Sequence, residues 1–157
     1  MKRFNWVDYT ILAIVILAVA LLAWSFLGDK EEEVAVAEGG DRLSVTFLAT
    51  GLDLSTAEAV VQSLQGNDLP FEGTMYPPTR IFNSDKMLDA DIVAWEILEQ
   101  EDGTANLLLT IEAESAFVTG SYSIGYQQIR VGKEYICKTM TMELEGIING
   151  ITVLEQL

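Results

Sequence analysis

An apolar run near the N-terminus is the feature that most constrains what this chain can fold into. Residues Ile11 to Leu27 read ILAIVILAVALLAWSFL, and Ser25 is their one polar residue. As a helix this run is about 25 Å long, and extending it back to Trp6 gives about 33 Å. That length matches the roughly 30 Å hydrocarbon core of a bilayer. The sequence therefore predicts a transmembrane helix over residues 6–27.

The charges that flank this run predict its orientation. Lys2 and Arg3 precede it, whereas Asp29 and Glu31–Glu33 follow it. Because basic residues are retained on the cytoplasmic side, we expect a single-pass protein of the cell membrane with a cytoplasmic N-terminus and its C-terminal domain outside. A cleaved signal peptide is the alternative, and AVAE at residues 35–38 offers a cleavage site beyond a charged spacer.

Asp8 lies at the start of the apolar run, where an acid needs an explanation. Asn5 and Asp8 have the spacing of a helix N-terminal capping box, which would place both at the membrane interface. The spacing from Phe4 to Asp8 also matches type IV pilin-like proteins. That family needs a glycine just before the phenylalanine, however, and this chain has Arg3 there. Capping is therefore our interpretation.

The rest of the chain divides by composition. We predict a cytoplasmic tip and membrane helix over residues 1–28, an acidic and glycine-containing stalk over 29–41, and an extracytoplasmic β-rich domain over 42–157. The predicted fold class is α+β: one N-terminal transmembrane helix, then a compact, mainly antiparallel β domain with one short helix. At about 115 residues the domain is long enough to bury its own core.

Local patterns predict individual elements of this domain. Arg42–Thr50 is rich in β-branched and aromatic residues and predicts a strand. Ser55 and Glu58 form a capping box that predicts a helix, with Gly66 placed to end it. Two dipeptides predict hairpins between apolar runs, namely Asp102-Gly103 and Asn149-Gly150. Leu107, Leu109, Ile111 and Ala113 are expected on one buried face of a strand.

Charge and composition exclude several functions. The chain has 9 basic and 24 acidic residues and no histidine. We therefore expect no nucleic-acid binding, no histidine-based catalysis and none of the usual zinc ligand sets. Cys137 is the one cysteine, so no internal disulfide can form. Without a neighbouring base to lower its pKa, this thiol is expected to pack in the core.

Two charged clusters are the candidate sites. Asp85, Asp89 and Asp91 could supply oxygen ligands to a hard cation, although a solvated loop is our interpretation because the EF-hand glycine and glutamate are lacking. Arg130, Lys133 and Lys138 form a basic concentration in an acidic domain and could contact an anionic partner or ligand. We predict no catalytic residue, no metal and no cofactor.

A family resemblance rests on FNWVDYTIL near the N-terminus and on GYQQIRVGKEYICKT (residues 125–139), which EGII follows. With these motifs the chain resembles the bacterial family called domain of unknown function 4330, from about Asn5 to Ile148. The resemblance implies a single-pass membrane protein of unassigned activity, with no catalytic residues to carry over.

The functional prediction combines these expectations. We expect a membrane-anchored, non-enzymatic accessory or adaptor protein of the bacterial cell envelope, with an envelope protein as its partner or with self-association. The bilayer would contact residues 6–27. The alternative is a structural assembly subunit, either pilin-like or another homo-oligomer built through the N-terminal helix. An acid-based hydrolase is a third hypothesis, resting only on the abundance of carboxylates.

Overall fold

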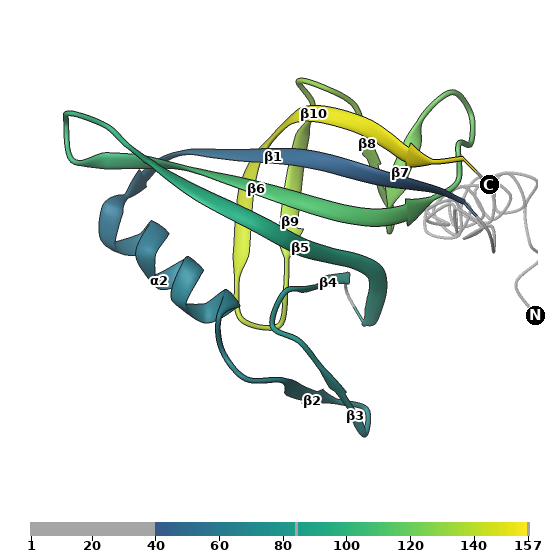
Figure 1. Ribbon diagram of the computed structural model, residues 1–157, viewed down its shortest axis with the longest axis horizontal. Coiled ribbons are helices and arrows are strands. Elements are labelled where there is room, and N and C mark those ends of the chain that lie inside the picture. The colour runs from purple at the N-terminus through teal and green to yellow at the C-terminus, as the bar shows by residue number, and fades with distance from the viewer. Residues whose placement is uncertain (1–39, 84, 157) are drawn as a thin grey trace, which may run out of the picture. The chain divides into compact units, whose positions relative to one another are not determined.

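Long antiparallel strands dominate the computed structural model, which describes residues 40–83 and 85–156 (Figure 1). In this part of the chain one helix, α2 (Leu54–Leu64), accompanies them. The strands are β1 (Asp41–Asp53), β2 (Leu69–Phe71), β3 (Thr74–Tyr76), β4 (Arg80–Asn83), β5 (Lys86–Glu99), β6 (Thr104–Ser115), β7 (Tyr122–Ile124), β8 (Gln127–Ile129), β9 (Glu134–Lys138) and β10 (Glu143–Glu155).

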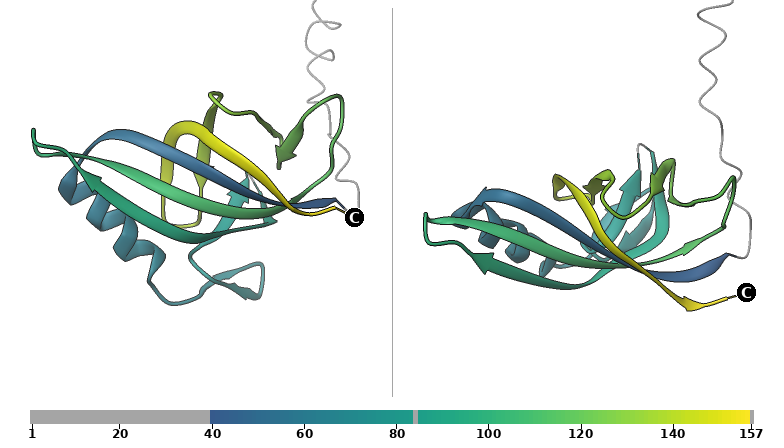
Figure 2. Two further views of the ribbon diagram at one scale, coloured as in Figure 1. Left: turned by 45° about the horizontal axis from the view of Figure 1, so that its top comes forward. Right: turned by 90° about the horizontal axis from the view of Figure 1, so that it is seen from above.

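Six strands form one sheet in the order β4-β5-β6-β1-β10-β9, and each neighbouring pair is antiparallel. The sheet bends strongly, so that the edge strands β4 and β9 approach one another on the side that faces the core (Figure 2). It therefore resembles a partly closed barrel. The helix α2 packs against β1, β5 and β6, and β2–β3 and β7–β8 form two separate small hairpins.

The core fills the concave side of this sheet. Along β6 every second residue from Ala105 to Ala113 is buried, which confirms the predicted buried face of this strand. Phe47 of β1 and Tyr135 of β9 meet edge to face, with 6.0 Å between their ring centroids. These two aromatic residues join strands that β10 separates, so their contact holds the bend of the sheet from inside.

The predicted α+β fold with a transmembrane helix is wrong for the described residues. They form a mainly antiparallel β fold, and α2 is its single short helix. The segment between α2 and β5 adds three further strands where the sequence indicated only a turn at the two prolines. Within the described residues, no helix combines the length and apolar character needed to cross a membrane. The helix predicted over residues 6–27 lies outside them.

The predicted helix after β1 is confirmed, but its predicted cap is wrong. The N-cap residue is Asp53, and no side chain caps the helix, because Ser55 lies inside the first turn. Ala57 and Leu64 are buried and Val60 and Val61 half-buried, as their helical spacing predicts. The helix ends at Leu64, with Gln65 as its C-cap.

Of the two predicted hairpins, only the one at Asp102-Gly103 exists. Thr104 donates its hydroxyl (2.7 Å) and its backbone N–H (3.0 Å) to the Asp102 carboxylate, which lowers the pKa of Asp102. Asn149-Gly150 instead lies inside β10, at a bulge where Thr46 pairs with Gly150 and Phe47 with Ile148. The nearby hairpin joins β9 to β10 at residues 139–142, where the Thr139 backbone N–H donates to the carbonyl of Met142.

Candidate functional site

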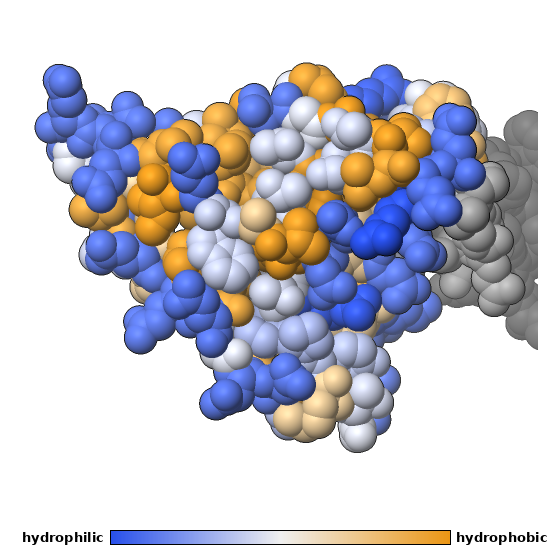
Figure 3. Space-filling view, in the orientation of Figure 1, coloured by the Kyte–Doolittle hydropathy of each residue, from blue (hydrophilic) through white to orange (hydrophobic). Residues whose placement is uncertain are grey.

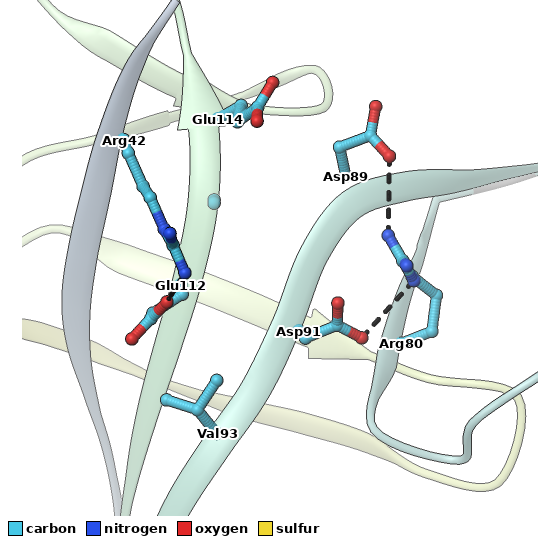
Figure 4. Close-up of a pocket in the computed structure, with 8 residues that line it drawn as sticks. Arg42, Arg80, Asp89, Asp91, Val93, Glu112 and Glu114 are labelled. Carbon is cyan, nitrogen blue, oxygen red and sulfur yellow. Dashed lines mark hydrogen bonds and ion pairs between the residues drawn. The ribbon is translucent and has the colours of Figure 1, made fainter. Parts of the chain in front are cut away.

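A polar groove lies on the convex face of the sheet, at the end where β1 begins. The charged residues that line it alternate along the strands with buried ones, so their side chains point away from the core. The groove has a volume of about 290 Å³. It is lined by Arg42, Arg80, Asp89, Asp91, Val93, Glu112, Ala113 and Glu114 (Figure 4).

Arg80 of β4 forms one wall of the groove. Its Nη1 donates to the carbonyl oxygen of Leu88 at 2.9 Å and lies 3.4 Å from Asp89 Oδ1. Its Nε lies 3.3 Å from Asp91 Oδ1, an ion pair without hydrogen-bond geometry between two atoms that solvent does not reach. Arg80 thereby links β4 to the start of β5. Its guanidinium already interacts with three groups of the protein itself.

Arg42 of β1 forms the opposite wall. Its Nη2 lies 2.6 Å from Glu112 Oε2 on the neighbouring strand β6. The arginine side chain is 55% exposed, against 25% for that of Arg80, so water weakens this ion pair. Arg42 is therefore better placed than Arg80 to contact a bound group.

The charges of the groove suit a cationic group. Four carboxylates and two guanidiniums line it, an excess of two formal negative charges. Three of the carboxylates already pair with an arginine. In residues 40–83 and 85–156, no three acids or cysteines converge to hold a metal ion. The groove could accept an ammonium or guanidinium group, such as a lysine or arginine side chain of a partner.

The structure separates the residues of both predicted clusters. Asp89 and Asp91 both face Arg80, whereas Asp85 lies in the turn before β5, where its backbone N–H donates to the carbonyl of Asn83. Arg130 and Lys133 share one turn, which Gly132 makes possible with its φ of 82°.

Lys138 lies at the other end of β9 from that turn and pairs with Glu143 at 2.9 Å. Arg130 and Lys133 are both exposed and therefore remain available as a basic pair without Lys138. Asn5 and Asp8, predicted to cap a helix at the membrane interface, lie outside the described residues.

Cys137 is buried in the core, as predicted. Burial raises the pKa of its thiol to about 12. Since the thiolate is the reactive form, this cysteine is poorly suited to nucleophilic chemistry. Its neighbour on the same strand face, Tyr135, also has a pKa raised by burial.

The sequence did not predict the groove, because its arginines and acids come from four different strands. Arg42 and Glu112, for example, are 70 positions apart in the chain. Alternation of polar and apolar residues shows which side chains share a face, but it does not show which strands are neighbours.

Comparison with known proteins places the chain in a family. The profile of a family described as Domain of unknown function (DUF4330) matches residues 1–152. The chain belongs to this family. The DUF4330 match spans nearly all of the chain and includes every groove residue. No curated protein and no solved structure matches the chain.

Proposed function

We propose that this DUF4330 protein is a non-enzymatic accessory protein of the bacterial cell envelope. Its apolar residues 6–27 hold it at the cell membrane, and its β domain lies outside and binds a partner protein. The open outer edge of β10 is the observation that carries this proposal. The partner adds a short strand to that edge, a common mode of peptide recognition.

The edge of β10 is open over its second half. β9 pairs with β10 only as far as Ile147, and the backbone of Ile148 bonds to that of Gly132 (2.7 Å) and Lys133 (2.9 Å). Beyond Ile148, no strand of the described residues pairs with this side of β10. Bulges at Asn149 and Leu154 bound the regular stretch, so it offers about four residues to a partner strand.

Side chains along this edge suit pairing with another chain. Edge strands are usually protected by charges or proline, whereas from Asn149 to Glu155 the one charged residue is Glu155. Val153 is 38% and Leu154 50% exposed, so a partner strand would also cover apolar surface. In the view of Figure 3, apolar side chains gather between charged ones over the long strands.

Two further features support a binding role. The groove between Arg42 and Arg80 has an excess of two formal negative charges and could accept a lysine or arginine side chain of the partner. The chain carries a formal charge of −15, which favours a basic partner and repels nucleic acid and anionic lipid.

A lysine placed on the edge of β10 tests the proposal. Thr152 is exposed on this edge, so Thr152→Lys adds a charge that opposes strand addition and leaves the core untouched. Thr50→Lys, at an exposed position of the central strand β1, is the matched control. The tagged full chain is cross-linked in cells, and the proteins recovered with it are identified by mass spectrometry.

We expect one partner to be recovered with the wild type and with Thr50→Lys. Recovery with Thr152→Lys should fall by about tenfold, which corresponds to ~1.4 kcal/mol of binding free energy. Equal recovery with both variants would contradict binding at β10.

Self-association is a second candidate function, because the same edge can pair with its own copy. Antiparallel pairing centred on Thr152 would place Glu155 opposite Asn149, so like charges would not meet. Light scattering on the full chain in mild detergent separates the two candidates. A dimer that Thr152→Lys converts to a monomer would favour self-association. An assembly built through residues 6–27 would be insensitive to this substitution.

A further inference from the structure

The loop between β6 and β7 displays apolar side chains at the tip of a tight turn. Phe117 is 61% and Val118 41% exposed. Val118 and Ser121 exchange two backbone hydrogen bonds of 3.0 and 3.2 Å around Thr119 and Gly120. Both turn residues have positive φ (53° and 82°), a conformation that glycine adopts freely but that costs free energy for a β-branched threonine. The turn is thus well defined, and it presents Phe117 and Val118 to the surroundings.

Neighbouring residues hold this tip in place. The Phe117 ring packs edge-on against Tyr122, with 5.0 Å between their centroids. The Tyr122 hydroxyl donates to Asp41 Oδ2 at 2.6 Å, at the start of β1. The Phe117 ring is therefore held by its contact with Tyr122, while most of its surface remains exposed to solvent.

The tip lies where the chain enters the domain. Asp41 pairs with Ser115 at the end of β6, and a side chain on Gly40 would overlap the backbone of Ser115 and Ala116. Gly40 is thus packed directly against the loop. Exposed Leu154, near the end of β10, lies at the same end of the sheet (Figures 1 and 2).

Covalent connection limits how far this end can be from a membrane that holds residues 6–27. Thirteen peptide steps separate Leu27 from Gly40, and a chain spans at most about 3.5 Å per residue, or roughly 45 Å in total. A weak apolar contact within that distance forms readily, because the tether raises the effective concentration of the bilayer.

We propose that Phe117 and Val118 insert into the interfacial layer of the bilayer and set the orientation of the domain on the membrane. This inference rests on the membrane tether of the proposed function. Aromatic residues favour this layer, where an apolar ring meets lipid and polar groups stay hydrated. Because Asp41, Glu114 and Glu155 lie at the same end of the sheet, the contact is with neutral headgroups and weakens on anionic lipid.

Site-specific fluorescence on the full chain in phosphatidylcholine vesicles tests this orientation. Thr119→Cys carries an environment-sensitive fluorophore at the tip. Glu101→Cys carries it in the turn at the opposite end of β6, a strand of 12 residues that is about 40 Å long at ~3.4 Å per residue. The buried Cys137 thiol does not label in the folded protein. We expect spin-labelled lipid to quench the fluorophore at residue 119 at least threefold more than the one at residue 101.

A double substitution, Phe117→Ser with Val118→Ser, should abolish that difference in quenching, whereas Phe117→Trp should retain it. Circular dichroism checks that each variant keeps its strands. If the protein inserts into vesicles but both positions are quenched equally, the orientation is wrong and the tether stands. If the wild type does not insert into vesicles at all, the tether and the orientation are both overturned.

Discussion

At the scale of single residues, Gln127 closes the outer edge of β9 with its own side chain. Its Nε2 donates to the carbonyl of Ile136 at 2.9 Å, and its Oε1 accepts the Ile136 backbone N–H at 3.0 Å. Gln127→Ala would leave both backbone groups without a protein partner. We expect a loss of about 1–3 kcal/mol in the free energy of unfolding, from the midpoint and slope of urea unfolding in mild detergent.

Gln128→Ala is the matched control, because this neighbour is exposed and makes no such bond. It should change the free energy of unfolding by less than about 0.5 kcal/mol. Gln127→Glu should fall between the two, since a carboxylate still accepts from the Ile136 N–H but cannot donate to its carbonyl. A Gln127→Ala variant as stable as the control would mean that water replaces the amide without cost.

At the scale of an element, β10 contains two glycines with different roles. A Cβ on Gly146 would lie 2.6 Å from the Phe47 ring and would also overlap the carbonyl oxygen of Leu48. Gly146→Ala should therefore cost about 2–3 kcal/mol, because the ring or the strand must move. A Cβ on Gly150 meets Thr46 at an ordinary 3.6 Å, so Gly150→Ala should be nearly neutral. Thermal unfolding of the two variants checks this difference, and equal melting temperatures would contradict it.

The same strand shows why part of the fold could be predicted from sequence and part could not. The hairpin at Asp102-Gly103 is predicted correctly from the sequence, because the turn depends only on residues within it. Gly103 adopts a φ of 84°, and Thr104 donates a hydrogen bond to the Asp102 side chain. Asn149-Gly150 has the same appearance, but the pairing of β10 with β1 absorbs it as a bulge. The real turn, at residues 139–142, has no glycine, and Thr139 Oγ1 accepts the Thr141 N–H instead. Tertiary pairing therefore decided between two local possibilities.

At the scale of the whole molecule, the candidate site depends on which strands become neighbours. Alternation predicted the buried face of β6, and the absence of a neighbouring base predicted the burial of Cys137. Both predictions rest on residues close in sequence. The groove and the open edge of β10 require the complete strand order, which brings β5, β6, β1 and β10 together from both halves of the chain. Periodicity carries no information about that order.

Burial of Cys137 and Tyr135 should make the stability of the whole domain sensitive to alkaline pH. The ordinary pKa of the thiol is 9.0, and burial raises it to about 12 in the folded protein. Above pH 9 the unfolded chain therefore loses the thiol proton first, so the folded state becomes less stable as the pH rises towards 12. From pH 9 to 10.5 the thiol alone should lower the free energy of unfolding by about 1.6 kcal/mol, at 1.36 kcal/mol per pKa unit, because the unfolded thiol is only half ionised at pH 9.

Urea unfolding at several pH values, followed by circular dichroism, measures this loss. Cys137→Ala should be less stable than the wild type at pH 7, because it leaves a small cavity, but its stability should fall less steeply above pH 9. Tyr135, whose pKa burial also raises, accounts for part of the slope that remains. Tyr126→Phe, at a position 41% exposed, controls for loss of a phenol outside the core. Parallel curves for the wild type and Cys137→Ala would mean that the pKa of the thiol is not raised in the folded protein.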